Sequence, residues 1–369
     1  MALGVLLARG TARFDALRNW ASVCLLGLVG MAPYARAESD CQWLDVGTTR
    51  SLRADCQTDQ TLFVPDGFTL DGRGHRLTAV DPPEGAFSGA VVQNAGNKAS
   101  VRRLVIDAGE LAPVCHPGTP VDTRVRAILL QDADGALVEN RIVAINQGLS
   151  GCQEGSAIEV RASRPVEVLI SANRIQNFQK TGIVLIGSID AGIYLNRIEG
   201  EGPIDYIAQN GIQLTGDVSG SVKLNHVSGV SYTGSEVSAT GILLINVENP
   251  VEISLNRVED TGLGLRLTAS NDISVTANTI RRSTYDGIAI DGRSGPAQRN
   301  RVLGNFISES GSVGIDLFGI GARLNLVRFN AIDRSLVAAL QEVLDAGDND
   351  LRWNGILGNV SQSELGSAP

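Results

Sequence analysis

A lysine between two acidic residues could act on an acidic polysaccharide. Lys180 follows Glu154 and precedes Asp205, and it has no other lysine near it in this part of the chain. A β-elimination lyase needs a base that removes the proton beside a uronate carboxylate, together with a cation that neutralises this carboxylate. Lys180 is therefore the candidate catalytic residue of a lyase.

A group of aspartates favours a different reaction. Asp286 is followed by Asp291 and Asp316, within the same stretch of the chain. A glycoside hydrolase uses two carboxyl groups that lie about 5 Å or about 6.5–9.5 Å apart. Asp286 is therefore the candidate catalytic residue of a hydrolase. The residue types do not decide between the two reactions, and both stay open.

Tyrosines occur in the same segments as these charged residues. Of the four tyrosines that follow residue 37, three lie there, and the faces of their rings can pack on the C–H groups of a sugar. The alternative is that the rings fill space beneath long loops. The residues predicted to bind a saccharide are Glu154, Asp205, Tyr206, Gln209, Tyr232 and Tyr285.

Metal and cofactor motifs are weak in this sequence. The three histidines, His75, His116 and His226, are far apart, and there is no Cys-x-x-Cys pair of the kind that binds zinc. No cofactor is expected. Calcium is compatible with the many acidic side chains, although no specific motif indicates it.

The cysteines predict disulfide bonds. Four of the five lie after residue 37, at positions 41, 56, 115 and 152. An even number of cysteines in an exported chain indicates two disulfides, for which three connectivities exist. We expect pairing between nearest neighbours, Cys41 with Cys56 and Cys115 with Cys152.

The first 37 residues have the order of a secretory signal peptide. Three arginines precede an apolar run at 21–31, and Ala35-Arg36-Ala37 offers small residues to a signal peptidase, with cleavage expected before Glu38. The run is shorter than the roughly 20 apolar residues of a spanning helix. The sequence therefore predicts a protein that is secreted, periplasmic or extracellular and is free of the membrane after signal removal.

The net charge excludes one class of partner. The chain carries −9 at pH 7, and loss of residues 1–37 removes four arginines and one aspartate, which leaves −12. Proteins that bind nucleic acid need a basic surface, so no nucleic-acid partner is expected. A monomer that meets a polysaccharide is the expected state.

An internal repeat indicates the fold. Aligning the chain on Asn-x-Ile/Val gives eight copies that follow one another at spacings of 22 to 33 residues. An asparagine side chain can donate to and accept from copies of itself in stacked repeats. The predicted structural ladder consists of Asn140, Asn173, Asn196, Asn225, Asn256, Asn278, Asn305 and Asn330.

Two further strands belong to each repeat. One begins with Gly-Ile or Gly-Leu, as at Gly211-Ile212-Gln-Leu214, and another precedes the asparagine, as at Val251-Glu-Ile253. Both alternate apolar with other residues, which is typical of strands with one buried face. Three short strands per repeat, each pairing with its copy one repeat later, predict a single-stranded parallel β-helix with three parallel sheets and about ten coils.

These repeats resemble the right-handed parallel β-helix repeat family of the pectate-lyase-like superfamily. The resemblance covers residues 60–334, and it includes the segment from Val64 to Leu77, which is similar to the opening coils of such proteins. It implies a right-handed coil with sites along the first sheet, whose strands begin at Gly-Ile, and along the loops that enter it. The Gly-His-Gly and Arg-Ile-Lys elements of polygalacturonases and the Asp-Pro-His motif of alginate epimerases are absent from this sequence.

The ends of the β-helix need caps, because open ends expose strand edges. We expect a disulfide-stapled cap at 38–60, the β-helix at 61–334, a helix at 335–347 followed by a last partial coil that ends at residue 360, and a disordered tail at 361–369. Ser335 and Gly347 are suitable residues to begin and end that helix. The sequence predicts a secreted protein that binds, and in one reading cleaves, a polysaccharide. A surface or structural protein without catalytic activity is the alternative.

Overall fold

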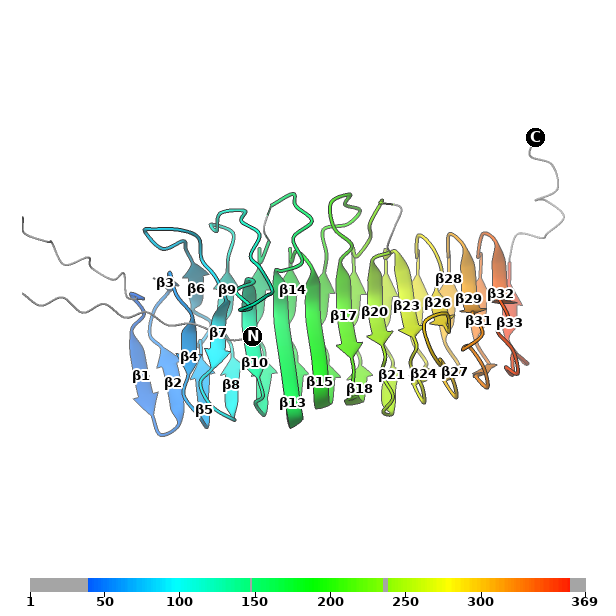
Figure 1. Ribbon diagram of the computed structural model, residues 1–369, viewed down its shortest axis with the longest axis horizontal. Coiled ribbons are helices and arrows are strands. Elements are labelled where there is room, and N and C mark those ends of the chain that lie inside the picture. Colours follow the sequence, from blue (N-terminus) through cyan, green and yellow to red (C-terminus); the bar gives the residue numbers. More distant parts are fainter. Residues whose placement is uncertain (1–38, 147, 235–237, 359–369) are drawn as a thin grey trace, which may run out of the picture. The chain divides into compact units, whose positions relative to one another are not determined.

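The computed structural model describes residues 39–358, except for residue 147 and residues 235–237. The described residues belong to one compact unit, Ala37–Pro369. All the regular elements among them are β-strands (Figure 1). They include no helix that could cross a membrane. The predicted signal peptide and the predicted tail at 361–369 lie outside the described residues.

The chain winds through successive coils, and each strand pairs in parallel with the equivalent strand of the next coil (Figure 1). The strands that begin near Gly-Ile form the first stack, which has eleven members along the described chain. They are β4 (Leu62–Val64), β7 (Ala90–Asn94), β10 (Arg126–Gln131), β13 (Ser156–Ser171), β15 (Thr181–Tyr194), β17 (Asn210–Thr215), β20 (Thr240–Ile245), β23 (Leu263–Thr268), β26 (Ile288–Asp291), β29 (Val313–Phe318) and β32 (Ala338–Val343).

The strands that precede the asparagines form the second stack. It opens with an antiparallel hairpin, β1 (Trp43–Val46) and β2 (Thr49–Leu52). It continues with β5 (Phe68–Asp71), β8 (Ala99–Arg102), β11 (Gly135–Val138), the second halves of β13 and β15, β18 (Val218–Lys223), β21 (Val251–Ser254), β24 (Ser274–Thr276), β27 (Arg301–Leu303) and β30 (Leu326–Arg328).

The first two stacks belong to one sheet, a feature that the three-sheet prediction lacks. Strands β13 and β15 run without a break from the first stack into the second, so the two stacks form a single 21-stranded sheet. In the other coils a turn separates the two strands. Each coil has three strands, as predicted, but the three stacks form two sheets instead of three.

The strands that follow the asparagines form the third stack, a separate 12-stranded sheet. Its strands are β3 (Cys56–Thr58), β6 (Arg76–Ala79), β9 (Val105–Asp107), β12 (Arg141–Val143), β14 (Arg174–Gln176), β16 (Arg197–Glu199), β19 (His226–Ser228), β22 (Arg257–Glu259), β25 (Thr279–Arg281), β28 (Phe306–Ser308), β31 (Ala331–Asp333) and β33 (Gly355–Leu357).

The asparagine ladder stands at the bend between the second and third stacks. Each ladder side chain donates from Nδ2 to Oδ1 of the asparagine one coil later, as in Asn225 to Asn256 at 3.0 Å. The same Nδ2 also donates to a carbonyl of the preceding coil, Ile193 in the case of Asn225, at 2.9 Å. Because the ladder residues are buried, these bonds satisfy polar atoms that would otherwise lack a partner. The ladder is confirmed, and it extends one coil further to Asn354.

A second, shorter ladder joins the last coils at the bend between the first and second stacks. Asn300 accepts from the backbone N–H of Ile273, and Asn325 and Asn349 repeat the arrangement in the next two coils. Asn325 also donates from Nδ2 to Oδ1 of Asn349 at 2.9 Å. These asparagines stabilise a second bend of the later coils.

The core is a set of aliphatic ladders. In the third stack Ile198, Val227, Val258 and Ile280 are in register on successive coils and are at most 1 % exposed. Burial of such a side chain contributes roughly 1.5–3 kcal/mol. The β-branched residue of each Asn-x-Ile/Val motif in this ladder therefore faces inward.

The predicted helix at 335–347 is wrong. This segment contains β32, which pairs in parallel with β29, with Ile315 opposite Leu340. Its alanines, leucines and glutamate have good helix propensity. However, β29 presents a row of unpaired backbone groups, and pairing with that row outweighs propensities of a few tenths of a kcal/mol per residue.

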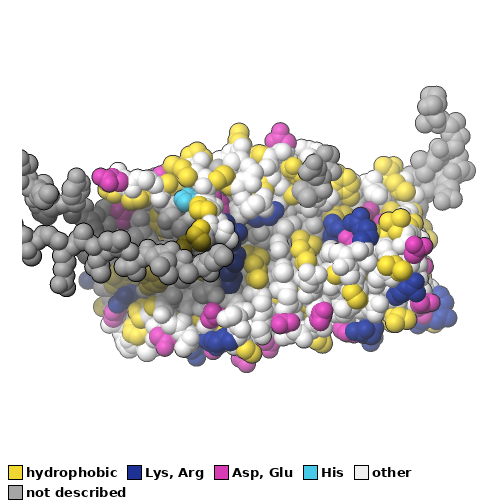
Figure 2. All heavy atoms as spheres, in the orientation of Figure 1, with side chains coloured by type: hydrophobic (Ala, Val, Ile, Leu, Met, Phe, Trp, Pro, Cys, Tyr) yellow, Lys and Arg dark blue, Asp and Glu magenta, His cyan; other side chains and the backbone are white. Residues whose placement is uncertain are grey.

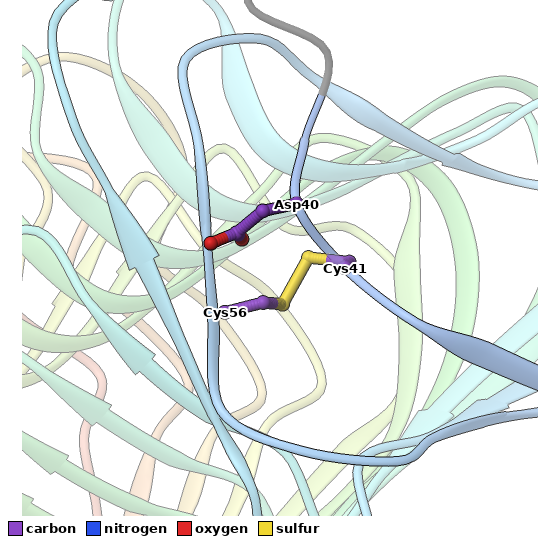
Figure 3. Close-up of side chains that lie close together, drawn as sticks. All are labelled: Asp40, Cys41 and Cys56. Atoms are coloured by element: carbon purple, nitrogen blue, oxygen red, sulfur yellow. A yellow bond between two sulfur atoms is a disulfide. The ribbon is translucent and has the colours of Figure 1, made fainter.

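Both predicted disulfides are present. Cys41–Cys56 ties the first segment to β3, and Asp40 beside it accepts a hydrogen bond from the backbone N–H of Gln57 at 2.6 Å (Figure 3). Cys115–Cys152 joins two loops that precede first-stack strands. The first of these crosslinks lies at the N-terminal end of the stack, where the cap was expected.

Candidate functional site

The outer side of the first stack carries a hollow of about 640 Å³, here called the central hollow. Residues of β17, β20 and β23 form its floor, and residues of the loops before β13, β15, β17 and β20 form one side. Figure 2 shows this face, with Lys and Arg side chains gathered over β10 and β13 and again over β23 and β26. The polar side chains that line the hollow are Gln153, Lys180, Tyr206, Asn210, Tyr232, Ser238, Thr240, Arg266, Thr268 and Arg293.

The floor follows from the alternation of the strands. Val184, Gln213, Leu243 and Arg266 are in register on successive coils, at a position that points outward. Leu243 and Arg266 line the hollow directly. The floor is therefore partly aliphatic, with amide and hydroxyl groups beside it, and it suits a ligand that has both C–H and O–H surfaces.

Lys180 enters the hollow from the loop before β15. Its Nζ donates a hydrogen bond to the carbonyl of Ala208 at 2.8 Å. Within the described residues no carboxylate forms an ion pair with it. Burial lowers the pKa of the Lys180 ammonium, because a low dielectric disfavours the charged form. Lys180 therefore offers an uncompensated, partly desolvated amine to a ligand.

Tyr206 belongs to the loop before β17. Its hydroxyl donates to Oε2 of Glu201 at 2.8 Å, and Asn146 donates to the other oxygen of that carboxylate at 2.6 Å. Burial and the neighbouring Glu201 raise the pKa of Tyr206 to about 12. The Tyr206 hydroxyl is therefore held as a neutral donor, and its ring lines the hollow.

Tyr232, from the loop before β20, also lines the hollow. It forms an isolated bridge with Ile204, and its side chain packs against the hydrophobic core. Its ring lies against Gly234, where an added Cβ would be 2.1 Å from the ring. The Tyr232 ring therefore contributes both to loop packing and to the wall of the hollow.

Two arginines close the C-terminal end of the hollow. Arg293 makes two hydrogen bonds of 3.0 Å to Asp291, and Arg266 pairs with the same carboxylate. Burial acts to raise the pKa of Asp291, but the bonds from both arginines hold this pKa below its ordinary value. Arg293 also stacks its guanidinium on Phe318. Arg293 is not among the residues predicted from the sequence, although it directly follows the Asp291-Gly292 turn at the end of β26.

Beyond these arginines lies a carboxyl group with an unusual pKa. Asp316 points outward from β29, and its Oδ1 is buried without a hydrogen bond. Burial, together with the charges of Asp286 and Asp291, raises the pKa of Asp316 to about 7, and Arg293 only partly opposes this. Asp286 accepts a hydrogen bond from the backbone N–H of Val313 at 3.1 Å. Asp316 is thus a carboxylic acid that keeps its proton close to neutral pH.

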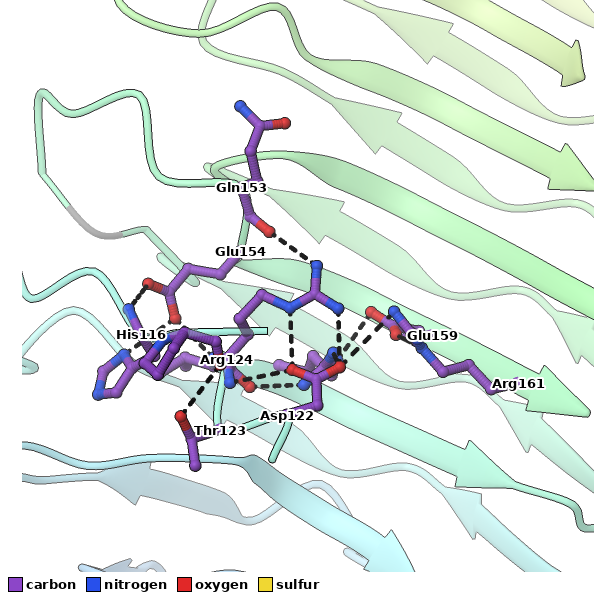
Figure 4. Close-up of polar contacts among 11 residues, drawn as sticks. His116, Asp122, Thr123, Arg124, Gln153, Glu154, Glu159 and Arg161 are labelled. Carbon is purple, nitrogen blue, oxygen red and sulfur yellow. Dashed lines mark hydrogen bonds and ion pairs between the residues drawn. The ribbon is translucent and has the colours of Figure 1, made fainter. Parts of the chain in front are cut away.

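A closed charge network lies at the N-terminal end of the hollow (Figure 4). Arg126 of β10 contacts Glu159 of β13 at 2.8 Å and also pairs with Asp122. Arg124 binds Asp122 at 2.7 Å and donates to the carbonyl of Gln153 at 3.3 Å. Burial acts to raise the pKa of Asp122, but its bonds to Arg124 and Arg126 bring this pKa well below its ordinary value. The arginines and carboxylates of this network are therefore paired with one another.

The structure separates the other residues that were predicted to bind a saccharide from the central hollow. Glu154 is 3 % exposed and accepts from both the backbone and the ring of His116. Gln209 is fully buried and bonds to backbone groups of Glu201 and Phe178.

The remaining predicted residues are at the surface. Asp205 is exposed beside Tyr206. Tyr285 is 37 % exposed and is followed by Asp286, whose charge helps to raise the pKa of Asp316. It does not line the central hollow. Lys180, Tyr206 and Tyr232 are thus the predicted residues that meet in one hollow.

Comparison with known proteins supports the fold. A family model described as "Periplasmic copper-binding protein (NosD)" matches residues 202–367. Among curated proteins, none matches the chain.

Two solved structures share the fold. The A-module of the mannuronan C-5 epimerase AlgE4 from Azotobacter vinelandii is 14 % identical, with a TM-score of 0.54, and the match covers 84 % of each chain. A mutant of the periplasmic alginate epimerase AlgG is 12 % identical, with a TM-score of 0.51, and the match covers 86 % of this chain and 79 % of that one. The resemblance to parallel β-helix proteins is confirmed.

The copper in the name of the matching family has no fitting ligand set among the described residues. Copper is bound by imidazole and by soft sulfur ligands. Each histidine hydrogen-bonds a carboxylate: His75 to Asp55, His116 to Glu154 and His226 to Glu259. The two clusters with metal-like geometry in the described chain consist of disulfide cysteines beside Asp40 or Glu154. The described residues therefore do not fit a copper site.

Proposed function

We propose that the protein binds an acidic polysaccharide in the central hollow. The observation that supports this most is Lys180, an amine without an ion-pair partner among the described residues, in a hollow that two tyrosines also line. The protein as a whole is acidic, with a net charge of −9. A local cation on such a protein favours an anionic ligand at that place.

The lining supports a saccharide with carboxylate groups. Lys180, Arg266 and Arg293 line the hollow, and no aspartate or glutamate is among its described lining residues. The faces of Tyr206 and Tyr232 offer surfaces for C–H groups, and Asn210 and Thr240 offer hydrogen bonds to hydroxyls. Two structures with a similar fold are named as a mannuronan epimerase and an alginate epimerase. Their structural similarity to this chain shows the fold only.

Cleavage by β-elimination is the chemistry that Lys180 would support. Its lowered pKa increases the share of neutral amine, which can take the proton on the carbon beside a uronate carboxylate. The electron pair then forms the C=C bond, the bond from the next carbon to the glycosidic oxygen breaks, and the leaving oxygen takes a proton from water. Arg266 and Arg293, at the end of the hollow, would stabilise the developing negative charge.

Hydrolysis is the second candidate, and the pKa of about 7 at Asp316 favours it. A carboxylic acid that keeps its proton near neutral pH can protonate the leaving glycosidic oxygen. Asp286, whose charge contributes to that raised pKa, would act as the base or nucleophile. In both reactions the saccharide would run along the first stack, across successive coils.

We further propose that the protein works outside the cytoplasm as a monomer. Two disulfides support an oxidising compartment. The matching family is described as periplasmic, as is AlgG. The predicted signal peptide agrees with this location.

Loss of a tyrosine ring tests the binding proposal. We expect Tyr206→Ala to weaken binding of an oligouronate by roughly 1–2 kcal/mol, with little change in melting temperature. Tyr285→Ala is the matched control, because this ring lies outside the hollow. A Tyr206→Ala variant that melts earlier but binds unchanged would favour the structural alternative, a surface rod without catalytic activity.

Product analysis separates the two reactions. Unsaturated ends that absorb in the ultraviolet and disappear in Lys180→Met indicate a lyase. Reducing ends that disappear in both Asp316→Asn and Asp286→Asn indicate a hydrolase. Binding without any product leaves a carbohydrate-binding protein and removes both catalytic proposals.

A further inference from the structure

Tyr194 is a tyrosine that the central hollow does not use. It lies on β15 in the second stack, and its ring lies back over Gly192 of the same strand. A Cβ added to Gly192 would be 2.5 Å from Cε2 of the Tyr194 ring and 3.0 Å from Cζ. The Tyr194 hydroxyl reaches Oγ of Ser221 on β18 at 2.9 Å. The hydroxyl end of the ring is thus held over Gly192 and tied to Ser221 of the next coil.

The Tyr194 ring does not fill space in the core. Tyr232 packs against the core cluster, whereas Tyr194 is not among the described residues that do so. Tyr194 lines an open hollow of about 410 Å³ on the outer side of the second stack, together with Leu169, Gly192 and Ser221. A ring that is held at its hydroxyl end and faces a hollow is suited to stack on a flat ligand.

A neighbouring hollow of about 590 Å³ adjoins the one that Tyr194 lines, because Glu167 and Asp190 line both of them. It also has Asp134 and Asp217 in its lining. No lysine or arginine lines either hollow in the described chain. The surface that these two hollows form is therefore negatively charged, whereas the central hollow is lined by cations. The two surfaces would select different ligands.

We propose that this surface is a second saccharide site, specific for a chain of amino sugars. One sugar ring would stack its C–H face on Tyr194. The protonated amines of this and neighbouring sugars would bind the carboxylates of Asp190 and Glu167. Ser221 and Ser219, which lie in the same two hollows, would hydrogen-bond sugar hydroxyls. The site is separate from the central hollow, and its existence does not depend on the function proposed there.

Binding of a β-1,4-linked glucosamine oligomer to the full protein at mildly acidic pH tests the proposal. We expect the oligomer to bind, and its fully N-acetylated, uncharged counterpart to bind at least about fivefold more weakly. The affinity for the glucosamine oligomer should fall with added salt, since salt screens exposed charges. Tyr194→Ala should weaken binding by about tenfold, or about 1.4 kcal/mol.

Gly192→Ala is the decisive variant, because it keeps the tyrosine. Its new Cβ needs the space that the ring occupies, and the ring can swing away without a change in the fold. We therefore expect the same loss of binding as in Tyr194→Ala, with an unchanged melting temperature. Asp190→Asn should also weaken binding. Glu252→Gln is the matched control, because Glu252 pairs with Lys223 and lines neither hollow.

The amino-sugar site and the proposed binding of an oligouronate in the central hollow can be refuted independently of each other. Tyr206→Ala should leave binding of the glucosamine oligomer intact, and Tyr194→Ala should leave binding of the oligouronate intact. The inference is overturned if the glucosamine oligomer does not bind, if Gly192→Ala binds it like the wild type, or if the N-acetylated oligomer binds equally well.

Discussion

The raised pKa of Asp316 makes stability depend on pH in a way that one substitution should remove. Burial and the neighbouring charges of Asp286 and Asp291 move the Asp316 pKa from 3.8 to about 7 in the folded protein. Folding thus favours the protonated form. The contribution of Asp316 to stability is fully present below about pH 4 and is lost as the pH rises through about 7.

The size of the effect follows from the pKa displacement. At about 1.4 kcal/mol for each tenfold change, a rise from 3.8 to about 7 corresponds to roughly 4 kcal/mol as an upper limit. Asp316 is partly open to solvent, which screens its charge, so about 1–2 kcal/mol is expected. The unfolding entropy of a chain of this length is roughly 0.7 kcal/mol/K, so the melting temperature should differ by about 1.5–3 °C.

Thermal unfolding of the wild type and Asp316→Asn over a pH series measures this difference. Asparagine resembles the protonated acid, so the two proteins should melt together below about pH 4, and the variant should melt increasingly higher as the pH rises, with the full difference above about pH 7. Asp205→Asn is the control, because Asp205 is exposed. A difference between wild type and Asp316→Asn that does not change with pH would refute the assigned environment of Asp316.

Three further substitutions test the fold. Val258→Asp should cost at least several kcal/mol in denaturant unfolding, because it puts an unpaired charge into the aliphatic ladder. Cys115→Ser should lower stability by about 3–4 kcal/mol, and mass mapping of the wild type should find the Cys115–Cys152 link and no free thiol at either position. Asn225→Ala should cost about 2–3 kcal/mol in the same unfolding assay, since Asn256 and the carbonyl of Ile193 lose a donor.

The coil architecture could be predicted from the sequence because its signal is repeated. Asn225 and Asn256 recur with a β-branched residue two positions later, and alternation sets which side of each strand faces inward. A slip of one residue would turn Val258 out of the core, so the register is strongly determined. Because the Asn-x-Ile/Val motif is repeated, the asparagine ladder between the second and third stacks could also be predicted.

Features without repetition were missed or misassigned. The segment that contains β32 has helix-forming residues, and only the neighbouring edge of β29 makes it a strand. The second ladder, Asn300, Asn325 and Asn349, spans too few coils to stand out, although its spacing of 25 and 24 residues matches the coil length.

The candidate site was predicted in part. Lys180, Tyr206 and Tyr232 precede strands of one stack, so stacking brings them together. The burial of Glu154 and Gln209 depends on loop contacts with His116 and Phe178, which local sequence does not reveal. The same is true of the position of the Tyr194 ring over Gly192, which depends on Ser221 in the next coil.

The most direct test of the proposed function is calorimetric titration of the protein with an oligouronate and with a neutral oligosaccharide of the same length. Lys180→Met removes the amine of the central hollow, and Lys98→Met, at an exposed site, is the matched control. We predict that the acidic oligomer binds more tightly than the neutral one and that Lys180→Met alone weakens its binding, by about tenfold or 1.4 kcal/mol. Equal binding of the two oligomers, or equal affinity of Lys180→Met and Lys98→Met for the acidic one, would contradict the account.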